Sequence, residues 1–410
     1  MTKRKILVVT FAPIVRDLGG PASAALGVAR SLHDQGRLAG VVSPGFDADE
    51  IGIPADRLHS PPHPLLLRIL DRVLAMMDSY WGGHQRRLRE IIFDFFLSRS
   101  RVLREAGAVL FLKPGFPRSA RSAAGFSIPT FVWASILHPA FNRDQVLEQR
   151  QIWGVEGGSA YTDEKRISRL EKFFHTVDHI LLGSRVAMRS FIDGGVAEEK
   201  IRLLEENFAI DCDRFSPSPK SRDDGVFRVL HVSQMNLIKG TGYLLRAWSD
   251  LELEKAQLVL VGSMEPGVAT LCDRIAPPST LRLGFSNEVA MHYREADLFI
   301  SPSVADLHPY TVLEAMASGT PVIVSDRCGV SAVVENGVNG FLYPHDDIES
   351  LEEKIRWCYE HPDALKRMGT AAREKATGCG RSRFSERVIG EIDRCIDSGP
   401  VDTGNFRGPS

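Results

Sequence analysis

The sequence predicts an α/β fold with two Rossmann-like domains that face each other across a cleft. Its 410 residues are more than one hydrophobic core usually serves, and the 43% apolar content can fill two cores. Short apolar runs alternate with helical patterns along most of the chain, which is typical of parallel sheets with right-handed crossovers. Residues 211–225, rich in Ser, Pro, Lys and Asp, interrupt this alternation and indicate an interdomain linker.

The first half of the chain predicts one sheet. A buried strand is expected at residues 5–10, then a turn at Gly19 and Gly20, then a helix that begins at Pro21, where proline suits the first helical position. The basic and then apolar N-terminus is too short for a signal peptide. Further strands are expected at 38–43, 109–112, 130–133, 179–182 and 201–204.

The second half predicts a second sheet. A final helix is expected over 381–397, and the tail 398–410 has the composition of a disordered end. The strands of this half are expected at 228–232, 257–262, 281–283, 298–301, 321–325 and 340–343.

Composition narrows the classes of function. A net charge of -2 gives no reason to expect a nucleic-acid partner. The six cysteines are scattered without close pairs, so neither a disulfide framework nor a zinc site is indicated, and the cytoplasm is the expected compartment. Two Asp-x-Asp triplets, at 47–49 and 211–213, lie in expected loops and are interpreted as solvated turns, so no essential metal is expected.

The most informative stretch is residues 306–320. It follows an apolar strand and begins as a loop before it turns helical, and ligands of parallel sheets bind at such strand ends. Amides at the start of a helix have no partner within it and carry the positive end of its dipole, so they suit a phosphate. Glu314, one turn into the helix, is better suited to accept hydrogen bonds from two ribose hydroxyls.

This stretch resembles the donor-binding segment of glycosyltransferase family 4. The resemblance lies in residues 301–303, Asp306 and residues 313–322, and it implies a retaining enzyme of the GT-B fold. By similarity Glu314 holds the ribose, while Asp306 stands where the family's first glutamate holds the sugar ring. The implied layout is an acceptor-side domain at 1–210, a linker at 211–225, a donor-binding domain at 226–380 and a helix, 381–397, that crosses back to the first domain.

The match also has departures. Asp306 is one methylene shorter than the usual glutamate, and Leu307 and Pro309 replace the family's two glycines. Because proline has no N–H, phosphate contacts are expected from amides such as those of Tyr310 and Thr311. His308, in the same loop, is a further donor-binding candidate, with an ordinary structural histidine as the alternative.

A second constellation follows the strand at 228–232. Residues 233–240 resemble the family's Gly-Arg-x-x-x-x-Lys-Gly segment, whose two cations neutralise the donor phosphates. Lys239 matches the lysine, and Gln234 replaces the arginine. Glutamine donates a hydrogen bond but supplies no charge, so Lys239 is expected to carry more of the electrostatic load.

The other site candidates have weaker signals. By similarity Gly19 and Gly20 approach the donor diphosphate, although an ordinary strand-to-helix turn explains them equally well. By the same resemblance, Gly262 is expected in a glycine-rich turn near the nucleotide, and Phe285 in a loop whose backbone contacts the base. His138 follows the strand at 130–133, where members of the resembling family carry a histidine near the transferred sugar, so it is a catalytic candidate. The alternative is a histidine with a purely structural role.

Residues 62–105 combine apolar clusters with several arginines. Such basic amphipathic helices can lie on an anionic bilayer, which would give peripheral contact with the inner membrane face and suit a lipid-linked acceptor. The alternative, favoured here, is ordinary helices packed on the sheet. No apolar run approaches the roughly 20 residues of a membrane-spanning helix.

The expected activity is transfer of a sugar from a UDP-, GDP- or ADP-sugar to an acceptor hydroxyl, with retention at the anomeric carbon and no cofactor. Lys239, Asp306 and His138 are the expected catalytic residues. The alternative is a noncatalytic protein that binds a nucleotide-sugar or serves as a partner subunit, which the missing arginine favours. A phosphorylase or epimerase lacks support, because nothing resembles a lysine motif for pyridoxal phosphate.

Overall fold

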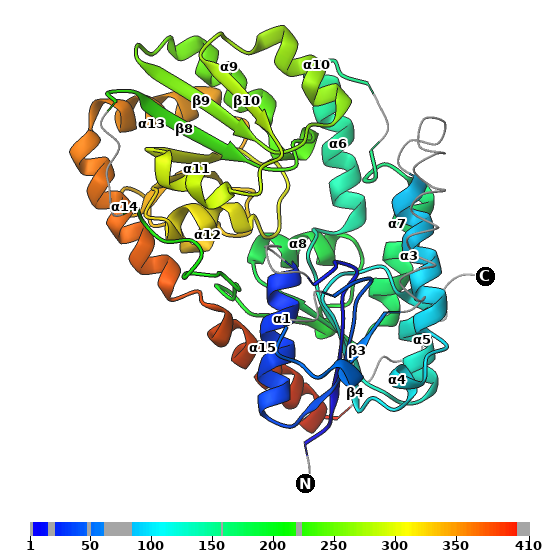
Figure 1. Cartoon of the computed structure of the whole chain (residues 1–410). Coiled ribbons are helices and arrows are strands. Elements are labelled where there is room, and N and C mark those ends of the chain that lie inside the picture. The colour runs from blue at the N-terminus through cyan, green and yellow to red at the C-terminus, as the bar shows by residue number, and fades with distance from the viewer. Residues whose placement is uncertain are drawn as a thin grey trace.

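The described part of the chain forms two parallel sheets, each with helices on its faces (Figure 1). A computed structural model describes residues 3–14, 21–46, 51–60, 84–156, 159–218 and 224–399. Every pairing between neighbouring strands is parallel in both sheets. The fold is therefore α/β with two Rossmann-like units, as the alternation of elements in the sequence predicted.

Among the described residues, the first sheet has seven strands in the order β3-β2-β1-β4-β5-β6-β7. The chain order reverses between β1 and β4, so their strand ends form the switch point at which open α/β sheets bind ligands. The strands are β1 (Ile6–Val9), β2 (Leu38–Val42), β3 (Leu58–His59), β4 (Ala108–Phe111), β5 (Thr130–Trp133), β6 (His179–Leu182) and β7 (Ile201–Leu203). The helices of this unit are α1 (Pro21–Asp34), α3 (His84–Leu97), α4 (Arg101–Arg104), α5 (Pro117–Gly125), α6 (Pro139–Trp153), α7 (Glu164–Thr176) and α8 (Arg185–Asp193).

The described residues of the second unit form a sheet of six strands in the order β10-β9-β8-β11-β12-β13. Its switch point lies between β8 and β11, which brings together the loops that follow these two strands. The strands are β8 (Phe227–Val232), β9 (Ala256–Val261), β10 (Thr280–Gly284), β11 (Leu298–Ser301), β12 (Val322–Ser325) and β13 (Gly340–Tyr343). The helices are α9 (Thr241–Leu251), α10 (Pro266–Ile275), α11 (Val289–Glu295), α12 (Tyr310–Ala317), α13 (Ile348–Glu360) and α14 (Pro362–Thr377), with a 3₁₀ turn η4 (Leu237–Lys239).

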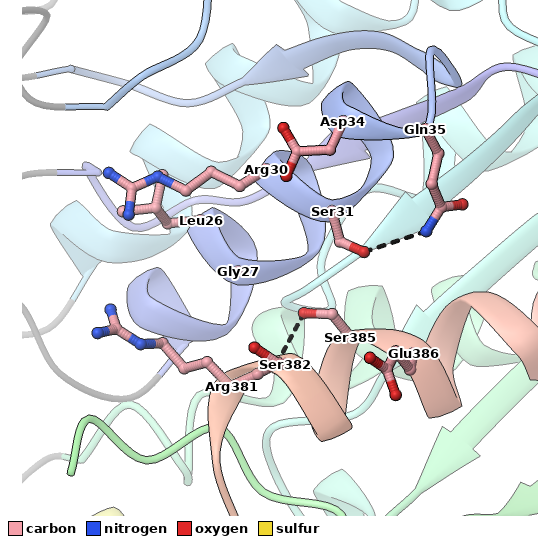
Figure 2. A pocket seen from close by; sticks show the side chains of 10 residues that line it. All are labelled: Leu26, Gly27, Arg30, Ser31, Asp34, Gln35, Arg381, Ser382, Ser385 and Glu386. Carbon is pink, nitrogen blue, oxygen red and sulfur yellow. Dashed lines mark hydrogen bonds between the residues drawn. The ribbon is translucent and has the colours of Figure 1, made fainter.

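The last helix, α15 (Arg381–Asp397), returns to the first unit and lies along α1 (Figure 1). Gly27 allows the close approach, because a Cβ at this position would lie 3.2 Å from the Ser385 hydroxyl. A hollow of about 310 Å³ remains between the two helices, lined by charges of both signs (Figure 2). Phe384 of α15 is fully buried and meets Trp133 of β5 edge-on, with ring centroids 5.0 Å apart.

The two units also touch through α6, which extends from the first unit to the second (Figure 1). Trp153, its last residue, meets Tyr243 of α9 edge-on at 5.0 Å between ring centroids. Its ring also fills the space beside Gly242, where a Cβ would lie only 2.6 Å from the indole. The loops at the β8–β11 switch point therefore lie close to the first unit.

A glycine makes the turn from η4 into α9. Gly240 has φ of +69°, and a Cβ there would lie 1.8 Å from the carbonyl oxygen of Pro302 in the loop after β11. Gly36 has a similar φ, +67°, with nothing within 4 Å of its missing Cβ.

We expect Gly36→Ala to cost about 1 kcal/mol, the usual penalty for a left-handed alanine, and Gly240→Ala to cost several times more, because backbone must also move. Urea unfolding of the two variants measures the difference. Equal losses of stability would show that the loops after β8 and β11 separate without cost.

Candidate functional site

The loops after β8 and β11 form one layer at the switch point of the second sheet. The amide of Val304 donates to the carbonyl of Ile238 at 2.9 Å, which joins the two loops. The amide of Gly329 donates to the carbonyl of Asp306 at 2.7 Å and ties the same layer to the turn after β12. A Cβ at Gly329 would lie 1.9 Å from the carbonyl oxygen of Leu307, so this position is sterically restricted to glycine.

Lys239 and Asp306 form an ion pair at the centre of this layer, between the lysine Nζ and the aspartate Oδ2. Their side chains are only 21% and 12% exposed. Burial acts to lower the pKa of Lys239, but the charge of Asp306 and the hydrogen bond between the two outweigh it, so the pKa is raised. Tyr161, from the loop before α7, is close enough to add to this rise. The structure thus brings together two residues that the sequence placed 67 positions apart.

Glu314 lies in the second turn of α12 and is nearly buried. The Tyr293 hydroxyl of α11 donates to its Oε2 at 2.9 Å. Burial raises the pKa of Glu314 to about 7, against the opposing effects of the Tyr293 hydrogen bond and the charge of Arg214. The carboxylate is therefore poorly solvated and gains from any added hydroxyl donor.

Tyr293 holds Glu314 from a rigid position. Its ring is fully buried, with Phe215 and Phe299 at centroid distances of 5.8 and 5.7 Å. Its carbonyl also accepts the Thr320 hydroxyl at 2.7 Å. Tyr293 carries no signal of this role in the sequence, because it lies in another helix, 21 residues before Glu314.

The amides at the start of α12 are only partly available. The Tyr310 amide donates to the carbonyl of His308 at 2.8 Å, so the phosphate contact expected from it requires that turn to open. The amide of Thr311 has no acceptor among the described residues. Of the two amides, that of Thr311 is the one without an acceptor among the described residues, and phosphate contact by either amide stays a prediction.

Three further donor-binding candidates lie near this layer or at its edge. Gln234 follows β8 and is exposed. Gly262 has φ of +126°, and a Cβ there would lie 1.9 Å from the carbonyl oxygen of Ser233, so the close approach of two loops explains this glycine. Phe285 is 78% exposed after β10. Donor contact by these three residues stays a prediction.

His308 packs between the two units. Its ring stacks on Trp133 at 5.0 Å and 21°, and it meets Phe208 edge-on at 5.7 Å. Burial lowers the pKa of His308 to about 3, and neither ring nitrogen has a hydrogen-bond partner among the described residues. In this arrangement His308 joins the donor loop to the first unit through a neutral ring.

His138 points into the first unit. Its ring meets Phe191 of α8 edge-on at 5.5 Å, and a Cβ at Gly194 would lie 2.4 Å from its Nδ1. Burial, with a smaller effect of His175, lowers the pKa of His138 to about 4. Its described neighbours do not include Lys239 or Asp306, so the catalytic role stays a prediction without geometric support here.

Several expectations fall outside the described residues. Gly19, Gly20, the triplet at 47–49 and residues 62–83 of the amphipathic region are among them. The described end of that region is α3 and α4. No helix in the described part of the chain has the length and apolarity to cross a membrane.

The raised pKa of Glu314 predicts a pH-dependent stability. A carboxyl whose pKa rises from 4.5 to about 7 on folding keeps its proton better in the folded state, so stability is lost as pH rises between these values. At pH 8 the ionised group costs the folded protein about 3 kcal/mol. Glutamine cannot ionise and still accepts from Tyr293.

We therefore expect Glu314→Gln to raise the melting temperature at pH 8 and to change it little at pH 5. Thermal unfolding of both proteins without ligand measures this. An equal gain at the two pH values would contradict the burial of an ionised carboxylate.

Comparison with known proteins gives the context of this site. Residues 226–361 match the family model described as glycosyl transferases group 1. A putative glycosyltransferase EpsD of Bacillus subtilis is 28% identical over 204 residues, 48% of this chain and 51% of the relative. The amylovoran biosynthesis glycosyltransferase AmsK of Erwinia amylovora is 24% identical over 286 residues, 66% of this chain and 70% of the relative. The chain spans about half the length of most curated relatives it matches.

Solved structures share the whole architecture. HepE of Anabaena, crystallised with UDP-glucose, has a TM-score of 0.66 at 16% identity, over 95% of this chain and 99% of that one. WaaG, a glycosyltransferase of lipopolysaccharide biosynthesis, also has a TM-score of 0.66 at 16% identity, over 94% of this chain and 99% of that one. Residues 226–361 are therefore similar to the group 1 glycosyltransferases, and the described part of the chain has the GT-B fold.

Proposed function

We propose that this chain transfers a sugar from a nucleotide-sugar to an acceptor hydroxyl. The observation that carries the proposal is the largely buried ion pair between Lys239 and Asp306 at the switch point of a domain that matches group 1 glycosyltransferases. HepE, which has the same fold, was crystallised with UDP-glucose, so a UDP-sugar is the donor we propose first. GDP- and ADP-sugars remain the alternatives.

The ion pair is suited to exchange partners when the donor binds. A diphosphate offers anionic oxygens to the Lys239 ammonium, and the sugar offers hydroxyl donors to the Asp306 carboxylate. Lys239 would then exchange a carboxylate for anionic phosphate oxygens, and Asp306 would exchange the ammonium for neutral hydroxyl donors, so both groups keep hydrogen-bond partners. Lys239 is thereby placed to stabilise the negative charge that develops on the leaving diphosphate.

Glu314 would hold the ribose. Tyr293 fixes the orientation of the carboxylate, and ribose hydroxyls would add the donors that this nearly buried group needs. The amide of Thr311, at the positive end of α12, would bind a phosphate oxygen. Phosphate and ribose contacts would then come from a single turn of helix.

For the chemical step we propose retention at the anomeric carbon. The departing phosphate oxygen would take the proton of the acceptor hydroxyl on the same face, so no carboxylate nucleophile is needed. In this step Asp306 would orient the sugar and would not act as a nucleophile. Lys239, its partner in the ion pair, would stabilise the leaving phosphate. We propose no metal or other cofactor for this step, and a cytoplasmic location.

The acceptor is proposed from the relatives. AmsK is named for amylovoran biosynthesis and WcaL of Escherichia coli for colanic acid biosynthesis. We therefore propose that the acceptor hydroxyl belongs to a growing glycan, free or lipid-linked.

A noncatalytic nucleotide-sugar-binding protein is the second candidate function. Gln234 favours it, because the position that carries an arginine in the resembling family supplies no charge here and the residue is exposed. In that case the donor would bind with little turnover to any acceptor.

Thermal unfolding against UDP, GDP, ADP and their sugar conjugates tests the donor site. At 1,000 times its dissociation constant a ligand stabilises by about 4 kcal/mol, so one nucleotide class should raise the melting temperature clearly. Lys239→Ala and Glu314→Ala should each abolish that shift. Lys366→Ala, which removes an exposed lysine of α14, is the matched control and should keep it.

A shift that survives in both site variants would place the nucleotide elsewhere. A different result would favour the noncatalytic candidate: the wild-type protein binds the donor, both site variants lose the shift, and the wild-type protein transfers sugar to no glycan acceptor.

A further inference from the structure

A basic groove lies on the first unit, between α3, α5 and α7. These three helices pack side by side (Figure 1) and leave a hollow of about 720 Å³, a size typical of small-ligand pockets. Glu164 is its only carboxylate among the described residues. The groove is defined by the cationic residues Arg87, Arg118, Arg121, Lys165, Arg169 and Lys172.

Two of these cations serve the structure. Arg169 pairs with the buried Asp94 at 2.7 Å and donates to the Gly115 carbonyl at 2.8 Å. Arg87 approaches Asp163 at 3.4 Å, and Asp163 also accepts from the first amides of α7. These contacts fix the relative positions of the helices that carry the remaining cations.

The other four cations are exposed and have no carboxylate partner among the described residues: Arg118, Arg121, Lys165 and Lys172. Arg118 and Arg121 are one turn apart on α5, whereas Lys165 and Lys172 are two turns apart on α7, about 10 Å along the axis. Four like charges held around one hollow repel each other and gain from a bound anion. Their spread suits more than one phosphate group.

Apolar side chains line the same hollow. Leu88 and Ile91 of α3 and Pro117 of α5 contribute to its walls. A concave site with an apolar wall and clustered cations suits a discrete organic phosphate better than a flat bilayer surface.

The groove is connected to the candidate donor site by a short segment. Asp163 begins α7 and approaches Arg87, and two residues earlier Tyr161 lies close enough to Lys239 to raise its pKa. The segment 161–163 thus joins the wall of the groove to a residue that acts electrostatically on Lys239.

We propose that the basic groove binds a molecule carrying a diphosphate, or two closely spaced phosphate groups. That this molecule is the acceptor of sugar transfer rests on the proposed function, whereas the anion binding itself does not. Arginine and lysine both bind phosphate through charge-assisted hydrogen bonds, which are stronger than neutral ones.

Titration calorimetry with inorganic pyrophosphate, at one low and fixed salt concentration, tests the groove. All proteins carry Lys239→Gln, so that pyrophosphate is not measured at the candidate donor site. The test variant adds Arg121→Gln and Lys172→Gln. The control adds Arg101→Gln and Lys366→Gln, which remove the same charges from side chains that are 88% and 80% exposed.

We expect the test variant to bind pyrophosphate about tenfold more weakly or worse, because two charge-assisted contacts are lost, and the control to stay within about twofold. Orthophosphate should bind more weakly than pyrophosphate to the control. Equal pyrophosphate affinity in test and control variants would overturn the proposal.

Sedimentation with phosphatidylglycerol vesicles, with phosphatidylcholine vesicles as the reference, tests the alternative that the groove binds an anionic membrane surface. Sedimentation with the anionic vesicles that depends on Arg121 and Lys172, without pyrophosphate binding, would overturn the proposal in favour of a membrane surface. Groove-dependent pyrophosphate binding in a chain that responds to no nucleotide would support the groove and defeat the proposed function.

Discussion

The ion pair between Lys239 and Asp306 is the constraint on which the rest of the site depends. Each charge follows a different strand of the second sheet, and the switch point between β8 and β11 places these strands side by side. Two nearly buried charges persist because each offsets the desolvation of the other. Glycines at positions 240 and 329 allow neighbouring loops to approach closely, and these loops hold the two charges beside each other.

The second carboxylate of the site is stabilised differently. Glu314 is nearly buried and receives a hydrogen bond from Tyr293, whose ring the core holds rigidly. The site therefore holds one acid with its charge paired and another with an incomplete set of donors. A nucleotide-sugar has complementary groups for both, with phosphates for the lysine and hydroxyls for the two acids.

Much of this architecture could be predicted from the sequence. Apolar runs located the strands to within about one residue, because central parallel strands are buried on both faces. The exception is β3, whose two residues carry no periodic signal. The motifs assigned Lys239 and Asp306 to one candidate donor site, but they did not predict the ion pair between them. The burial of His308 against Trp133, the occupied amide of Tyr310 and the support of Glu314 by Tyr293 also depend on contacts between distant segments, which motif spacing does not encode.

The most direct test compares the binding of the nucleoside diphosphate and of its sugar conjugate to wild type, Lys239→Gln and Asp306→Asn by titration calorimetry. If the donor exchanges partners with the ion pair, Lys239→Gln weakens both ligands, because the phosphate loses its cation. Asp306→Asn then leaves the affinity for the nucleoside diphosphate unchanged or higher, because the lysine is released. The same variant lowers the affinity for the sugar conjugate, because the sugar loses its contact with the carboxylate. Equal loss of both ligands in both variants would contradict the account.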